Sequence, residues 1–149
     1  MATPRDILVA PGVGNYVITC NNSTDAVKPG HIVTRTGETA DTRNVAWPDG
    51  ADDLPLGVVG CAPGHDIDTA YSVGDMMPVY VVGGGAEVWV RVKTSAGVIY
   101  RGLLAAEDSG TANGLAIIGT EGTYELAGRF TMESADVGAE RWGRMRLSL

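Results

Sequence analysis

The chain has 149 residues, close to the usual size of one domain, and its composition of 44% hydrophobic and 19% charged residues is globular. A formal net charge of −7 disfavours a nucleic-acid partner, because phosphate binding requires clustered Lys and Arg. No apolar stretch approaches the roughly 20 residues that cross a bilayer, so we expect a soluble protein made in the cytoplasm.

The first segment, residues 1–12, contains Pro4 and Pro11, which block helix formation. We predict an extended N-terminal arm here and a single β domain over residues 13–149. The two cysteines, Cys20 and Cys61, form no CxxC motif and predict no metal site. We interpret them as small buried apolar residues, and a disulfide between them stays open.

Glycine is abundant, with 21 residues, about twice the usual share of roughly 7%, which indicates many tight turns between short elements. One pattern recurs: an apolar residue, a spacer, a glycine and an apolar strand. It covers Val27–Val33, Tyr71–Met77 and Ile99–Leu104. Gly30 and Gly57 are 27 residues apart, and Gly102 and Gly128 are 26. The spacing predicts two similar β units, at about residues 25–60 and 97–131, with coincidence as the alternative interpretation.

The clearest strand signals come late in the chain. In Glu87–Lys93, three valines alternate with Glu87, Trp89, Arg91 and Lys93. Near the C-terminus, Met145, Leu147 and Leu149 alternate with Trp142, Arg144, Arg146 and Ser148. The run Val79–Val82 ends at three glycines, for which we predict a hairpin turn into the Glu87 strand. A mostly antiparallel barrel or sandwich follows from these patterns.

Catalytic motifs such as GxSxG, HExxH and the Walker sequence do not occur, and we predict no catalytic residue, metal or cofactor. The one site-like cluster is Gly64–Tyr71, which holds His65, Asp66 and Asp68. Its Asp68 and Tyr71 resemble the uracil-recognition hairpin of trimeric dUTPases, where an Asp holds the sugar hydroxyl and a Tyr stacks below the sugar. An extra residue before Gly74, and the lack of that family's Ser-Gly and glycine-rich arm motifs, count against this interpretation.

A longer resemblance spans about residues 25–147. The segments Val27–Val33, Leu56–Val59 and Val73–Val81, together with Gly84, are similar to the head decoration (capsid cement) proteins of tailed viruses. Departures are the long acidic loop from Glu38 to Asp53, and His31 at a position where an acidic residue is common.

The resemblance implies an all-β fold, a compact β-barrel or β-clip-like domain with little or no helix. It also implies a homotrimer on the capsid surface of a virion, made in the host cytoplasm, that bridges major capsid protein subunits without enzymatic activity. A tail or baseplate module is the alternative. Interface candidates are the two prolines of the arm and residues of polar strand faces: Pro4, Pro11, Trp89, Trp142, Arg144 and Arg146. For the two tryptophans, the alternative is packing under a loop of their own subunit.

Overall fold

The structure, a computed structural model, describes residues 3–24, 26–39, 42–47, 54–107, 114–120, 125–135 and 139–148. Within these ranges every regular element is a strand, which confirms the predicted all-β fold. The strands are β1 (Leu8–Ala10), β2 (Val17–Asn22), β3 (Ile32–Thr39), β4 (Thr42–Ala46), β5 (Pro55–Val59), β6 (Met76–Val81), β7 (Glu87–Val92), β8 (Leu104–Glu107), β9 (Ala116–Ile118), β10 (Leu126–Phe130) and β11 (Arg141–Arg146).

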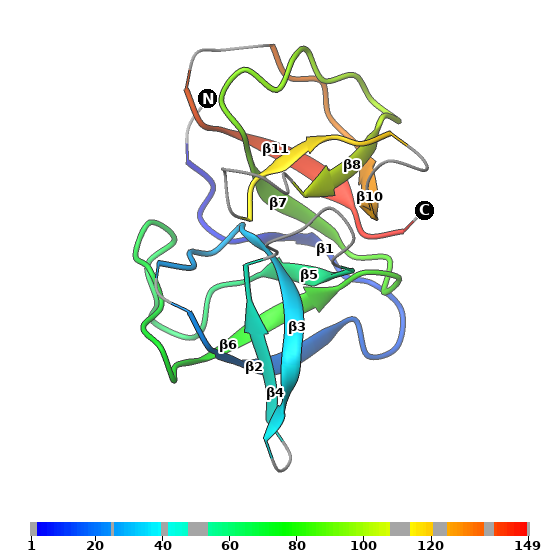
Figure 1. Cartoon of the computed structure of the whole chain (residues 1–149). Coiled ribbons are helices and arrows are strands. Elements are labelled where there is room, and N and C mark those ends of the chain that lie inside the picture. The colour runs from blue at the N-terminus through cyan, green and yellow to red at the C-terminus, as the bar shows by residue number, and fades with distance from the viewer. Residues whose placement is uncertain are drawn as a thin grey trace.

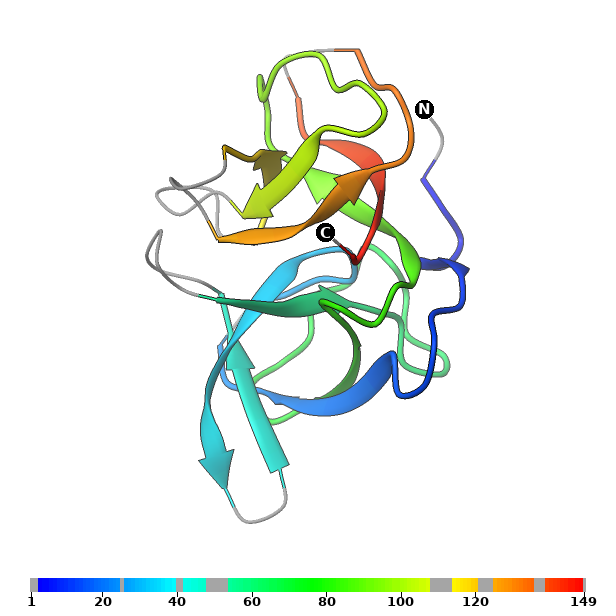
Figure 2. The ribbon, with the colours of Figure 1, turned by 90° about the vertical axis from the view of Figure 1, so that its right-hand side faces the viewer.

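These strands form two small barrels, which lie one above the other in two perpendicular views (Figures 1 and 2). The first barrel closes in the order β2-β4-β3-β5-β6. In the second, β7-β11-β10-β8-β9 returns to β7 through an additional β7–β9 pairing. Strand β1 joins β7 from outside this ring, beside β9.

The two barrels have the same strand order. In each, the first strand pairs in parallel with the third and antiparallel with the fifth, as β2 does with β4 and β6, and β7 with β9 and β11. The remaining pairs are antiparallel in both. The predicted units at 25–60 and 97–131 fall on corresponding parts of the two rings. That they are copies of one unit stays a prediction.

The recurring glycine pattern has one local structure. Gly30, Gly74 and Gly102 each have a φ of about 90° and occupy the third position of a four-residue turn. In each turn, the N–H of the fourth residue donates to the carbonyl of the first residue. Only glycine adopts this φ without strain. Each glycine N–H then donates to a neighbouring strand at 2.8 Å, from Gly30 to Val59, from Gly74 to Asn22 and from Gly102 to Phe130. The glycines therefore turn the chain into a strand, as the sequence predicted.

The residue after the glycine also has a role in two of the turns. Asp75 Oδ2 accepts the N–H of Ser72 at 2.8 Å, and His31 Nδ1 accepts the N–H of Lys28 at 3.0 Å. His31 therefore supplies the acceptor that an acidic residue supplies in the other turn. Burial, with Arg91 and Lys28 nearby, lowers the pKa of His31 to about 3, so its ring is neutral at physiological pH.

The two hydrophobic clusters divide the interior unequally. The first barrel encloses a small cluster of mostly short side chains: Cys20, Val27, Val33, Val45, Val59, Tyr71, Met77 and Val79. The larger cluster fills the second barrel and extends to the outer face of the first, where it includes Ile32, Val58 and Tyr80. The barrels therefore share a continuous apolar contact.

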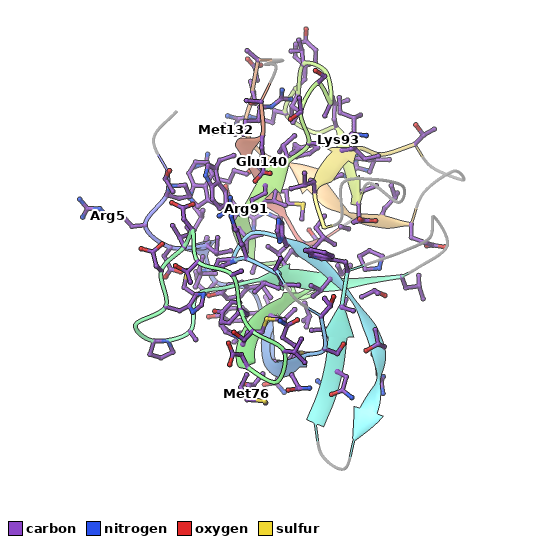
Figure 3. All side chains as sticks on the ribbon, turned by 60° about the vertical axis from the view of Figure 1, so that its left-hand side comes forward. Arg5, Met76, Arg91, Lys93, Met132 and Glu140 are labelled. Atoms are coloured by element: carbon purple, nitrogen blue, oxygen red, sulfur yellow. The ribbon has the colours of Figure 1, made fainter. Side chains whose placement is uncertain are left out.

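Arg91, on β7, links the second barrel to the first through hydrogen bonds and ion pairs. Its guanidinium donates to the carbonyls of Pro29 at 2.8 Å and Ile67 at 2.7 Å, and its Cζ lies 4.4 Å from the ring centroid of Trp142. The carboxylates of Asp68 and Glu140 pair with it at 3.2 and 3.1 Å. Figure 3 shows Arg91 and Glu140 together at this junction. A charged side chain only 7% exposed is thus satisfied from both barrels.

Two sequence predictions need correction. The glycines Gly83–Gly85 connect the barrels and form no hairpin, since β6 pairs with β2 and β5 whereas β7 pairs within the other sheet. The Glu38–Asp53 segment, expected as a loop, includes β4 and the end of β3, which form a hairpin. Residues 40–41 and 48–53 lie outside the described part of the chain.

Candidate interface surfaces

The outward face of β7 and β11 carries most of the predicted interface residues. Val88, Val90 and Val92 are fully buried, which confirms the predicted alternation and leaves Glu87 and Trp89 facing outward. On β11, Met145 is buried while Arg146 is exposed. Because Glu87 lies directly opposite Arg146, and Trp89 opposite Arg144, these four residues form one continuous surface.

An open pocket of about 480 Å³ lies beside this surface. Its lining holds four arginines, one carboxylate and four further residues. The lining residues are Glu87, Arg101, Gly102, Arg129, Phe130, Thr131, Arg144, Arg146 and Ser148. We call it the arginine pocket. It gathers four of the eleven basic residues of an acidic chain.

Glu87 organises the pocket. Arg146 Nη2 donates to Glu87 Oε2 at 3.1 Å, and the Thr131 hydroxyl donates to Oε1 at 3.0 Å. Arg144 Nε lies 2.8 Å from Oε1 but lacks a hydrogen-bonding angle, so this contact is an ion pair only. Arg144 also lies over Trp89, with its Cζ 5.7 Å from the ring centroid. One carboxylate thus holds two arginines in place.

The two tryptophans predicted as interface residues, Trp89 and Trp142, have different surroundings. Trp142 is 8% exposed and packs under Gly30 and Arg91 of its own chain, so little of its surface is left for a partner. Trp89 is half-buried beside the arginine pocket. The interface role predicted for Trp89, Arg144 and Arg146 stays a prediction, now with a defined surface.

The N-terminal arm is partly built into the fold. Ile7 is fully buried in the larger cluster, and its carbonyl accepts the N–H of Trp89 at 2.8 Å. Strand β1 continues along β7. Pro4 is half-buried and Pro11 is exposed. An arm that reaches a partner would therefore begin before Ile7, and this role too stays a prediction.

The cluster at Gly64–Tyr71 offers a poor fit to a nucleotide. The ring of His65 stacks on Tyr71 with centroids 3.8 Å apart, which covers one face of the ring that a sugar would need. The Tyr71 hydroxyl donates to Gly60 O and accepts from Ala62 N, both at 2.8 Å. Asp68 is paired with Arg91. These contacts assign the side chains a structural role.

Both cysteines are free thiols. Cys20 is fully buried, as predicted, and Cys61 is half-buried. Burial raises the pKa of each thiol to about 11, so both are protonated near neutral pH. Within the described ranges, no three His, Cys, Asp or Glu side chains are grouped to hold a metal ion. A search of the same ranges finds no helix able to span a membrane.

Sequence reasoning missed Glu87, Arg101 and Arg129 as parts of a site. A weak signal was present, because Arg101 and Arg129 each stand beside an echoed glycine, at Gly102 and Gly128. The position of Arg129 beside the arginines of β11 depends on the register of β10 against β11, which pairs Arg129 with Arg146. No pattern in the sequence specifies that register.

The fold and this face together define a tandem β-barrel protein with one open, charged surface. No known family matches the sequence, and no curated protein does. The fold is similar to a solved structure, the N base of head fiber gp8.5 from bacteriophage phi29. The TM-score is 0.51 at 13% identity, over 87% of this chain and 91% of that chain. The resemblance to head decoration proteins thus has a structural counterpart in a phage head protein.

Proposed function

We propose that this chain is a structural protein of a tailed-phage virion, located on the capsid surface. The observation that carries the proposal is the similarity to a head-fiber base over most of both chains. Two barrels joined by a shared apolar cluster and a buried arginine make a rigid body, as a shell-bound protein requires. The arginine pocket and Trp89 offer a surface for protein contacts.

In the finer form of the proposal, the chain is a homotrimer at local threefold positions that bridges major capsid protein subunits. Sedimentation velocity of the purified protein tests the trimer, which should have three times the 15.5 kDa mass of one chain. Incubation with purified heads, followed by pelleting, tests capsid binding. A strict monomer that also fails to pellet with heads would overturn the proposal.

Electron microscopy of virions labelled with an antibody against the chain tests its location. Label on the head shell supports the proposal, whereas label confined to the tail would replace it with the tail or baseplate role. The proposal assigns no catalytic step. Incubation with dUTP and magnesium should therefore release no pyrophosphate, and release would contradict it.

A further inference from the structure

We infer that the arginine pocket is a binding site for the carboxylates of an acidic protein segment. The inference rests on the pocket itself and does not depend on a virion role. Four arginines and one glutamate give the lining a formal charge of +3, on a chain whose total is −7. So local a positive charge on an acidic surface favours a small anionic group.

The strand register places two of the like charges side by side. Arg129 and Arg146 lie directly opposite each other on β10 and β11, a like-charge pair that destabilises a sheet. Glu87 pairs with both Arg144 and Arg146 and offsets one of their two positive charges. Arg101 and Arg129 are exposed at the rim, where, among the residues that the structure describes, Arg129 donates to the Gly102 carbonyl at 3.0 Å. Their two guanidiniums are therefore available to an outside carboxylate.

The face of the first barrel that corresponds to the arginine pocket is already in contact with other parts of the chain. The backbone N–H of Gly60 donates to the Pro78 carbonyl, and the backbone N–H of Thr131 donates to the Arg144 carbonyl in the same way. Pro78 and Tyr80 on β6 therefore occupy the positions that correspond to Arg144 and Arg146 on β11. Val58 and Tyr80 of this face are buried as members of the larger cluster, and the Tyr80 ring also stacks on that of Tyr16, with centroids 6.4 Å apart. The scaffold thus uses this face for contact, and the second barrel presents it open and charged.

A carboxylate fits better than a nucleic acid. Guanidinium forks pair with carboxylates in two-point geometry, and Glu87 shows that Arg146 and Arg144 approach one here. A nucleic acid needs a continuous basic track, whereas a pocket of about 480 Å³ accommodates a few side chains.

Fluorescence anisotropy with a labelled, end-blocked hexaglutamate peptide tests the inference at low ionic strength. The wild-type chain should bind, and the double variant Arg101→Gln/Arg129→Gln should bind about tenfold more weakly, because it removes two charge-assisted hydrogen bonds at an exposed rim. Removing the internal competitor in Glu87→Gln should tighten binding about threefold. Circular dichroism melts check that each variant is folded.

The matched control is Arg5→Gln/Arg43→Gln, which removes two exposed charges outside the pocket. Arg5 projects outward at the left of Figure 3, away from the other labelled side chains. The control should bind within twofold of wild type. Equal losses in both double variants, or no peptide binding by folded wild type, would overturn the inference.

Two competitors separate the possible anions. A single-stranded oligonucleotide that binds more tightly than the peptide would replace the inference with a nucleic-acid site. Inorganic phosphate that displaces the peptide at equal concentration would replace it with a phosphate site. Peptide titration followed by NMR of the arginine side chains should shift Arg101 and Arg129 signals first. Because these readouts use the isolated chain, they can fail independently of the labelling of virions.

Discussion

The two barrels share one strand order but use the same outer face differently. In the first barrel, Val58 and Tyr80 are buried and belong to the larger apolar cluster. In the second barrel, Arg129 and Arg146 occupy the corresponding face and are exposed. The contrast teaches that the same face of one strand order can be buried and apolar in one barrel and exposed and charged in the other.

The largest expected effect comes from breaking the junction between the barrels. Arg91→Ala should lower the free energy of unfolding by about 3–4 kcal/mol, because it leaves the carbonyls of Pro29 and Ile67 without a donor and removes packing against Trp142. The exposed carboxylates of Asp68 and Glu140 contribute little of this loss.

Urea unfolding followed by tryptophan fluorescence measures this loss. Arg91→Lys should recover part of the stability, since an ammonium donates to fewer partners than the guanidinium fork. A variant with alanine at position 91 that is as stable as wild type would show that the barrels do not depend on this residue.

Because the two barrels have the same strand order, alanine substitutions at corresponding glycines should lower the stability by similar amounts. A Cβ at Gly57 would meet the carbonyl oxygen of Tyr80, and a Cβ at Gly128 would meet that of Arg146. Gly57→Ala and Gly128→Ala should therefore each cost about 2–3 kcal/mol in urea unfolding. Gly64→Ala, at an open turn with a φ of 77°, should cost about 1 kcal/mol. Unequal losses at Gly57 and Gly128 would break the correspondence between the barrels.

Acid should destabilise the chain through His31. Its pKa is about 3 in the folded state, against 6.5 for the ordinary group, mainly because of burial. The unfolded chain therefore takes up the proton first, and stability falls as pH drops from about 6.5 towards 3. At pH 4.5 the loss should be about 2–3 kcal/mol, from roughly 1.4 kcal/mol per pH unit.

His31→Asn retains an uncharged acceptor for the Lys28 N–H and should flatten this part of the stability profile. Chemical unfolding at a series of pH values measures both slopes. An unchanged slope in the variant would assign the acid sensitivity to other groups.

The smallest expected effect tests the exposed arginines. Arg129→Val introduces the residue type found at the corresponding Val58 and relieves the like-charge pair with Arg146. Stability in thermal unfolding should change by less than about 0.5 kcal/mol. A large loss would show that the arginine pocket supports the fold, against its assignment to recognition.

The sequence predicted the fold class and the turns because these depend on local signals. Alternation identified the inward valines of β7, and the glycine pattern located turns that only a positive φ permits. The glycine spacing predicted two β units, but the connection between the barrels was misread as a hairpin, because Gly83–Gly85 looks the same whether it joins paired strands or separate sheets. Pairing of distant strands, such as β7 with β11, follows from packing of the whole chain.

The candidate site was predicted only in part for the same reason. Arg144 and Arg146 were found as members of one strand, whereas Arg101 and Arg129 come from a turn and another strand. For Trp142 the sequence allowed both an interface role and packing within its own subunit, because its burial under Gly30 depends on how the first barrel docks. The supporting residue Arg91 gave no signal beyond its place in an alternating strand.

Strands β1 and β11 run in the same direction on opposite edges of β7. The chain enters β1 beside Trp89, within β7, and leaves β11 beside Ala86, which directly precedes β7. A pulling force applied between the chain ends therefore loads both strand pairs lengthwise, so that several hydrogen bonds must break together. The whole first barrel lies outside this path. Tension between the ends would reach it only after β1 had sheared away from β7.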